Sequence, residues 1–168
     1  IHLSCDLCVI GGGISGMFAA IAAAREGLQD ILIHARPMLG GNASSEIRMW
    51  VCGARGSGNR ETGILAEIML ENLRRNTTKN IYVWQMVLNE FVEREKNITL
   101  LLNCTCNDAE VEQGEFADGR TVRIKSITGY QMTTQTFIDV EAALYADCSG
   151  DSILAPLTGA EFRIGREC

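Results

Sequence analysis

Apolar and polar residues follow one another in this chain so that a strand, a helix and a second strand are predicted within the first 34 residues. Residues 5–10 are nearly all apolar, as expected for a parallel strand that is buried on both faces. Residues 14–26 follow as an alanine-rich helix, and Gly27 is placed to end it. Residues 30–34 form a second apolar run. The pattern therefore predicts a βαβ unit of the usual length.

The middle of the chain is expected to be helical. Apolar residues recur at helical spacing over about 61–75 and again over about 81–95, which predicts two amphipathic helices. An apolar strand is expected at 98–102 and runs on to Cys106.

Strict alternation replaces the helical pattern farther on. Between Ala109 and Val140 apolar and polar residues alternate, with breaks at Gly114, at Asp118–Gly119 and near Gly129. This predicts an antiparallel meander over about 107–140.

Two further elements complete the predicted fold. Residues 143–148 return to a buried strand, and a helix is expected at 152–157. The predicted fold class is α/β: a three-layer, Rossmann-like dinucleotide-binding domain with a parallel central sheet and an antiparallel β-meander as crossover.

Composition and charge exclude several classes. The 168 residues are 46% hydrophobic, enough for a core, and carry a net charge of −6, which argues against a nucleic-acid surface. No apolar run is long enough to cross a membrane. The chain opens at Ile1 without a basic leader, so the compartment stays open: we favour the cytoplasm slightly, and export to the periplasm fits if a signal was removed upstream.

The seven cysteines are an odd number scattered through predicted core elements, which is typical of buried thiols. Cys5 and Cys8 have the spacing of a metal or redox pair, but side chains three apart on a strand point to opposite faces. Cys104 and Cys106 share a face, yet the chain has only two histidines to complete a zinc site. We therefore expect no metal.

Glycines follow the first strand in the spacing Gly11-x-Gly13-x-x-Gly16. Gly11 permits a tight turn, Gly13 lets a pyrophosphate approach the backbone, and Gly16 lets the helix lie close to the strand. The phosphates would bind the free N–H groups at the helix N-terminus. This motif marks a nucleotide site whose candidate residues are Gly11, Gly13, Ile14, Ser15 and Gly16.

The second strand ends in a departure from the usual dinucleotide pattern. Asp or Glu is expected there to bind the adenosine ribose, but this chain has His34, followed by Ala35 and Arg36. A neutral imidazole can hydrogen-bond a hydroxyl, or His34 can simply end the strand. Arg36 can instead recognise a ribose phosphate. All three residues are candidates for the adenosine end of the site.

The segment Leu39-Gly40-Gly41-Asn42-Ala43-Ser44-Ser45-Glu46-Ile47-Arg48 follows directly. A dinucleotide βαβ unit with this continuation resembles the FAD-binding domain of glutathione-reductase-like flavoproteins. The string from Gly40 to Arg48 is similar to the large, mostly bacterial family of FAD-dependent oxidoreductases.

The resemblance implies positions for a bound FAD. It places Gly40, Gly41, Asn42 and Ala43 along the pyrophosphate and ribityl chain. Ser44, Ser45, Glu46 and Arg48 would point towards the flavin or substrate side, although Glu46 and Arg48 can also form a local ion pair. Further along the chain, it implies contacts from Cys106, Ser149, Gly150 and Asp151.

Asp151 has two possible roles, and Cys52 excludes one class of flavoprotein chemistry. Asp151 either caps the helix at 152–157 or binds hydroxyl groups of the cofactor. The disulfide reductases of the same superfamily carry a Cys-x4-Cys pair beyond the second glycine turn, whereas this chain has only Cys52 there. Dithiol exchange with a flavin is therefore not expected.

We interpret residues 1–168 as the FAD-binding domain of a larger flavoprotein, without its substrate domain. The expected function is two-electron oxidoreductase chemistry with FAD on an unidentified small-molecule substrate, and the fragment alone is expected to be inactive. An NAD(P)-binding dehydrogenase domain and a non-catalytic nucleotide-binding scaffold stay open as alternatives. The sequence assigns neither a catalytic residue nor an oligomeric state.

Overall fold

The structure is a computed structural model that describes residues 1–54, 57–58, 60–116, 119 and 121–166. Its elements, in chain order, are β1 (His2–Ile10), α1 (Ile14–Arg25), β2 (Asp30–His34), a 3₁₀ turn (Gly41–Ala43), α2 (Gly63–Arg75), α3 (Ile81–Glu93), β3 (Ile98–Leu102), β4 (Cys104–Gln113), β5 (Val122–Gln131), β6 (Thr136–Asp147) and α4 (Leu154–Thr158). The three long predicted helices are confirmed, with their ends shifted by at most two residues.

The strands form one mixed sheet in the order β3-β2-β1-β6-β5-β4. The pairs β3–β2, β2–β1 and β1–β6 are parallel, and β6–β5 and β5–β4 are antiparallel. β6 joins the two parts, because Thr136–Glu141 pair with β5 and Asp139–Asp147 pair with β1. The strand predicted at 143–148 is therefore the second half of a longer strand, and the predicted α/β fold class is confirmed.

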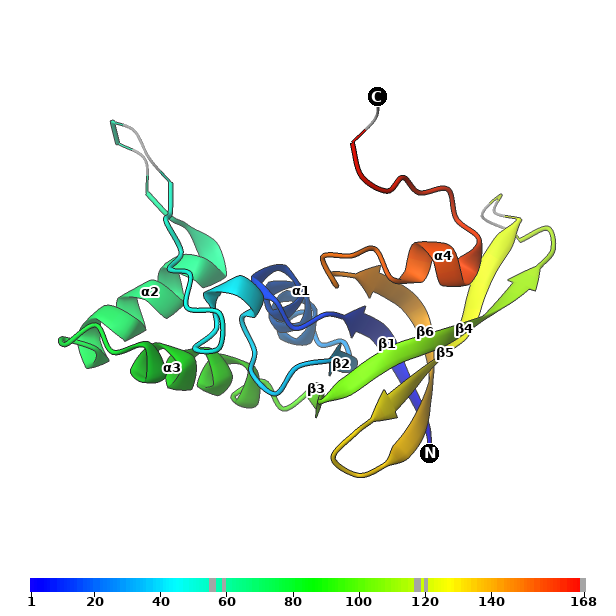
Figure 1. Cartoon of the computed structure of the whole chain (residues 1–168), viewed down its shortest axis with the longest axis horizontal. Helices are drawn as coiled ribbons and strands as arrows, with labels where there is room; N and C mark the ends of the chain where they lie inside the picture. The colour runs from blue at the N-terminus through cyan, green and yellow to red at the C-terminus, as the bar shows by residue number, and fades with distance from the viewer. Residues whose placement is uncertain (55–56, 59, 117–118, 120, 167–168) are drawn as a thin grey trace.

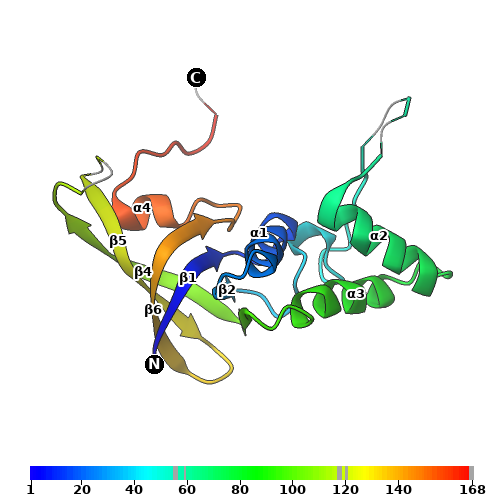
Figure 2. The ribbon, with the colours of Figure 1, turned by 180° about the vertical axis from the view of Figure 1, so that it is seen from behind.

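Two hydrophobic cores separate the molecule into layers (Figures 1 and 2). On one face of the parallel strands, α1 and α3 bury Met17, Ile21, Leu32 and Leu88. On the other face, the meander of β4, β5 and the first half of β6 covers Ile33 and other buried residues. Among the described residues, no helix has both the length and the apolar composition needed to cross a membrane.

The side-chain alternation of β1 contains one irregularity that the sequence did not reveal. Cys5 and Cys8 both pack on the meander side, so the expectation that they face opposite sides of the sheet is wrong. The N–H groups of Asp6 and Leu7 both point at the carbonyl oxygen of Gln29, at 2.9 and 3.4 Å, and this doubled pairing marks the shift in alternation. Even so, the described part of the chain contains no group of three His, Cys, Asp or Glu residues that could hold a metal ion.

The meander also differs in detail from the prediction. Asn103, with φ +51°, separates β3 from β4, so Cys106 lies in β4 and not on an extension of β3. Gly129 lies inside β5 and not in a turn. A Cβ atom at Gly129 would lie 2.8 Å from Sγ of Cys104, so this glycine allows the neighbouring strand to approach. The break predicted at Asp118–Gly119 includes Asp118, which lies outside the described residues.

Candidate functional site

The first glycine turn joins β1 to α1 at the carboxyl edge of the parallel strands. Gly11 has φ +108°, and a Cβ atom there would lie 2.3 Å from the carbonyl oxygen of Cys148. At Gly16 a Cβ atom would lie 1.8 Å from the carbonyl oxygen of Gly11, so the helix approaches the turn too closely for any side chain. These two glycines are required by the fold itself.

Gly13 is different, because its backbone is ordinary, with φ −68°. A Cβ atom there would meet only Cα of Gly41, at 4.0 Å, and would project into the space between the two glycine turns. Gly13 is also the N-cap residue of α1, and no side chain caps this helix. The first N–H groups of α1 are therefore free for a ligand at the positive end of the helix dipole.

The second glycine turn lies directly against the first. The N–H of Gly40 donates to the carbonyl oxygen of Gly12 at 2.8 Å, and Gly13 and Gly40 form a parallel bridge. Gly40 and Gly41 have φ values of +105° and +56°, which favour glycine. The two turns thus present backbone atoms to each other and to the space between them.

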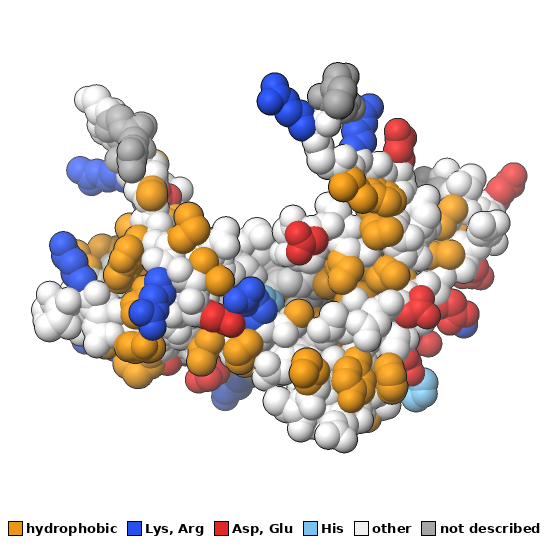
Figure 3. Space-filling model, in the orientation of Figure 1, with side chains coloured by type: hydrophobic (Ala, Val, Ile, Leu, Met, Phe, Trp, Pro, Cys, Tyr) orange, Lys and Arg blue, Asp and Glu red, His pale blue; other side chains and the backbone are white. Residues whose placement is uncertain are grey.

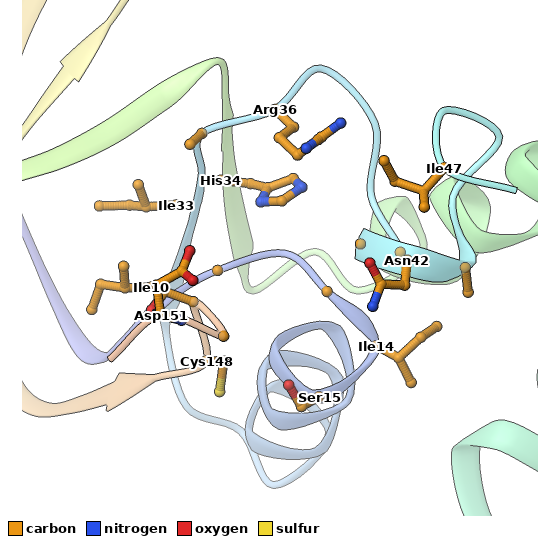
Figure 4. Close-up of a pocket in the computed structure, with 18 of the residues that line it drawn as sticks. Ile10, Ile14, Ser15, Ile33, His34, Arg36, Asn42, Ile47, Cys148 and Asp151 are labelled. Atoms are coloured by element: carbon orange, nitrogen blue, oxygen red, sulfur yellow. Dashed lines mark hydrogen bonds between the residues drawn. The ribbon is translucent and has the colours of Figure 1, made fainter. Parts of the chain in front are cut away.

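A cleft of about 840 Å³ opens between these turns and the first strand of the meander (Figure 3). In Figure 4, Asn42 and Ile14 lie across it from Ile10, Ile33 and Asp151, and His34 lies between the two sides. Fifteen of the seventeen residues predicted to bind the cofactor line this cleft: Gly11, Gly13, Ile14, Ser15, His34, Ala35, Arg36, Gly40, Gly41, Asn42, Ala43, Cys106, Ser149, Gly150 and Asp151.

Two predicted residues do not line the cleft. Gly16 lies behind the first turn, where it permits the close approach to Gly11. Ser44 is completely buried, and its hydroxyl oxygen accepts hydrogen bonds from the N–H groups of Glu46 and Ile47, each at 3.3 Å. Both therefore act on the shape of the backbone around the cleft.

His34 is held by two backbone groups and is 7% exposed. Its Nδ1 accepts a hydrogen bond from the N–H of Gly12 at 3.0 Å, and its Nε2 lies 3.0 Å from the carbonyl oxygen of Met38, which requires the proton on Nε2. Burial lowers the pKa of His34, so the neutral form is favoured. Since both ring nitrogens are engaged, a hydrogen bond from His34 to a ribose would have to break one of these contacts.

Arg36 lines the cleft beside His34 and Ala35, and Glu46 holds its side chain. Nε of Arg36 lies 2.9 Å from Oε2 of Glu46. This ion pair raises the pKa of Arg36 and lowers the pKa of Glu46. The local pair that the sequence allowed between Glu46 and Arg48 is replaced by this one.

Arg48 is instead fixed to α3 and to its own loop. It adopts φ +66°, and its guanidinium donates to the carbonyl oxygen of Ser45 at 3.0 Å and to the hydroxyl of Tyr82 at 2.9 Å. Cys52, the single cysteine that follows the second glycine turn closely, is exposed and lies outside the cleft lining.

The segment after β6 approaches the cleft from the side opposite the second turn. Asp147 ends the strand, and its carboxylate accepts hydrogen bonds from the N–H groups of Ser149 at 3.0 Å and Leu154 at 2.8 Å. α4 begins at Leu154, and Ile153 occupies its N-cap position without a side-chain cap. The expectation that Asp151 caps this helix is therefore wrong, because Asp147 supplies the carboxylate, while Asp151 lines the cleft.

The sequence did not identify ten residues that also line the cleft: Ile10, Ile33, Ile47, Met49, Trp50, Val51, Cys104, Thr105, Cys148 and Ile153. The ends of the parallel strands and the residues next to each predicted turn would have been a usable signal for several of them. Met49, Trp50 and Val51 follow the segment that carries the resemblance, and only the folded chain places them at the cleft. Burial raises the pKa of the thiols of Cys104, Cys106 and Cys148, that of Cys106 to about 11, which disfavours a thiolate nucleophile.

Solved structures share this fold over nearly the whole chain. The protein THI4 of Thermovibrio ammonificans is 18% identical, with a TM-score of 0.65 over 95% of this chain and 65% of that protein. L-proline dehydrogenase from P. horikoshii is 19% identical, with a TM-score of 0.51 over 88% of this chain and 23% of the other. The myxobacterial chondrochloren halogenase CndH is 17% identical, with a TM-score of 0.58 over 89% of this chain and 38% of the other. The TM-scores show a shared fold, and at these low identities they show nothing more. This chain spans less than two thirds of the length of each protein.

No curated protein matches the sequence. The family model described as FAD dependent oxidoreductase matches residues 6–168, nearly the entire chain. With the two facing glycine turns and the shared fold, this match shows that the chain belongs to the family of FAD dependent oxidoreductases.

Proposed function

We propose that this chain binds FAD in the cleft between its two glycine turns and serves two-electron oxidoreductase chemistry on a small-molecule substrate. The observation that carries the proposal is the pairing of the uncapped N-terminus of α1 with the open space at Gly13. A pyrophosphate fits there, because free N–H groups and a positive helix end favour an anion, and no Cβ atom blocks its approach.

The residues around the cleft suggest how FAD would lie. The adenosine would point towards His34, Ala35 and Arg36, with Cys106 beside the base. The ribityl chain would follow the second glycine turn, and Ser149–Asp151 would contact it from the other side. The apolar side chains of Ile47–Val51 at the cleft would then cover one side of the flavin ring.

FAD supplies reversible two-electron transfer when it is bound. The described residues would bind it, orient it and limit the access of water to its polar chain. None of them is assigned here as a catalytic acid, base or nucleophile. The interpretation of residues 1–168 as one domain of a larger flavoprotein, its glutathione-reductase-like subtype and its bacterial origin remain predictions of the sequence.

The cofactor itself is the first test. The purified protein should be yellow, and the compound released by heat should run with FAD in chromatography. A colourless protein that binds NAD or NADP would favour the dehydrogenase alternative instead, and one that binds none of the three would favour a scaffold without redox activity.

Gly13→Val tests the placement. Because Gly13 has an ordinary backbone conformation, valine should fit the fold while its side chain enters the pyrophosphate site. We expect FAD affinity to fall by more than about 100-fold, as for a blocked anion site. Gly114→Val is the matched control, since Gly114 also has an unstrained backbone and lies outside the cleft. Equal FAD affinity in both variants would contradict the placement.

A further inference from the structure

The second glycine turn is held from behind by a side chain that the cleft itself does not contain. Gln85 of α3 is buried, with 5% of its surface exposed. Its Oε1 accepts a hydrogen bond from the N–H of Ser45 at 2.8 Å. Its Nε2 donates to the carbonyl oxygen of Leu39 and to Oδ1 of Asn89, both at 2.9 Å.

These contacts fall on both ends of one short segment. Leu39 precedes and Ser45 follows the four residues, Gly40 to Ala43, that line the cleft. A single amide thus ties the entry and the exit of the second glycine turn to one helix. Trp84 adds a contact within the segment, because its Nε1 donates to the carbonyl oxygen of Ala43 at 2.7 Å.

The opposite side of the same segment faces the first glycine turn. A Cβ atom at Gly41 would lie 3.1 Å from Cα of Gly13, so the two backbones are almost in contact. Any shift of the second turn towards or away from α3 changes the width of the space at Gly13. The position set by Gln85 therefore determines the geometry of the proposed pyrophosphate site.

We propose that Gln85 is a positioning residue for the cofactor, which fixes the second glycine turn before FAD binds. This inference rests on the proposed function. An amide suits the role because it must accept from Ser45 and donate to Leu39 at once. A carboxylate can only accept, and a backbone carbonyl such as that of Leu39 cannot become a donor.

Two substitutions separate positioning from simple packing. Gln85→Leu removes all three hydrogen bonds and should weaken FAD binding about tenfold or more, by the same factor at every pH, because buried polar groups lose their partners. Gln85→Glu should weaken binding comparably at pH 8. Because burial at this position raises the pKa of a carboxyl group, part of the glutamic acid is protonated at pH 5.5 and can again donate to Leu39, so part of the lost affinity should return there. Met86→Glu, which places the same charge on the neighbouring exposed position of α3, should bind within about twofold of the unchanged protein.

FAD dissociation constants, divided by that of the unchanged protein at each pH, are the measurement. If the Gln85 variants are folded and less stable but bind FAD normally, the residue is structural only and the inference fails. If the unchanged protein binds no FAD, the proposed function fails instead. Hydrogen exchange needs no variant: the amide of Ser45 should exchange slowly in the FAD-free protein, and fast exchange there in a folded protein would also overturn the inference.

Discussion

Asp30 offers a quantitative test of the structure away from the cleft. It begins β2 and is 1% exposed, and neither oxygen of its carboxylate has a hydrogen-bond partner among the described residues. Burial, followed by the nearby charge of Asp6, raises the pKa of Asp30 from 3.8 to about 6. Replacing this residue by asparagine removes the ionisation and nearly conserves the shape.

The magnitude follows from the two pKa values. A rise of about two units corresponds to about 3 kcal/mol at 1.36 kcal/mol per unit. The folded chain holds its proton to a higher pH than the unfolded chain. The ionisation of Asp30 therefore costs nothing well below pH 3.8, destabilises the fold increasingly as the pH rises to about 6, and acts fully above that pH.

The quantity to compare is the free energy of unfolding of Asp30→Asn minus that of the unchanged protein. We expect this difference to increase by about 2 to 2.5 kcal/mol when the pH rises from 4 to 7.5. Urea unfolding of both proteins at the two pH values measures this change. All other titrating groups are common to both proteins, so their effects cancel to a first approximation.

Asp6→Asn is the useful comparison, since it removes the smaller of the two causes and should produce a smaller change. A stability difference between Asp30→Asn and the unchanged protein that does not vary with pH would refute the reasoning. It would mean that the carboxylate of Asp30 accepts a hydrogen bond from a protein group or from water in solution.

Two further predictions concern Gly16, behind the first glycine turn, and His34, which lines the cleft. Gly16→Ala should destabilise the fold by about 3 kcal/mol or more in urea unfolding, because its Cβ atom would lie 1.8 Å from the carbonyl oxygen of Gly11; stability equal to that of the unchanged protein would contradict the close packing. His34→Ala should cost about 1–3 kcal/mol at pH 8, since Gly12 and Met38 lose their partner. Burial lowers the pKa of His34 below 6.5, so the unchanged protein loses stability as the pH falls through 6.5. The stability difference between the unchanged protein and His34→Ala should therefore be smaller at pH 5.5 than at pH 8. Thermal unfolding of both proteins at the two pH values checks this.

The sequence predicted those parts of the site that depend on local backbone geometry. The spacing of Gly11 and Gly16 follows from a strand that turns directly into a helix, and the folded chain shows the close contacts that exclude side chains there. The Gly40–Gly41 turn was identified by resemblance. In both cases, neighbouring residues in the chain contain the information.

Contacts between distant segments could not be predicted in this way. The position of His34 at the end of β2 was correct, but its partners come from the first glycine turn and the following loop, and they decide which of its nitrogens are free. Asp151 has the sequence context of a helix cap. However, β6 extends to Asp147, and the carboxylate of Asp147 accepts the hydrogen bond from the N–H of Leu154 at the start of α4. The meander turn was misplaced at Gly129 because a glycine needed for close strand packing has the same sequence signal as one needed for a turn.

The same distinction bears on how the cleft is built. Each glycine turn lacks side chains on the face that meets the other, so neither can fix its own position by packing there. The first turn is anchored through Gly12 to His34, and the second through Leu39 and Ser45 to Gln85. Both anchors are neutral, buried side chains that donate and accept at the same time, which a charged side chain in either place could not do without a change of protonation. The width of the proposed pyrophosphate site should therefore depend more on His34 and Gln85 than on any other side chain at or behind the cleft.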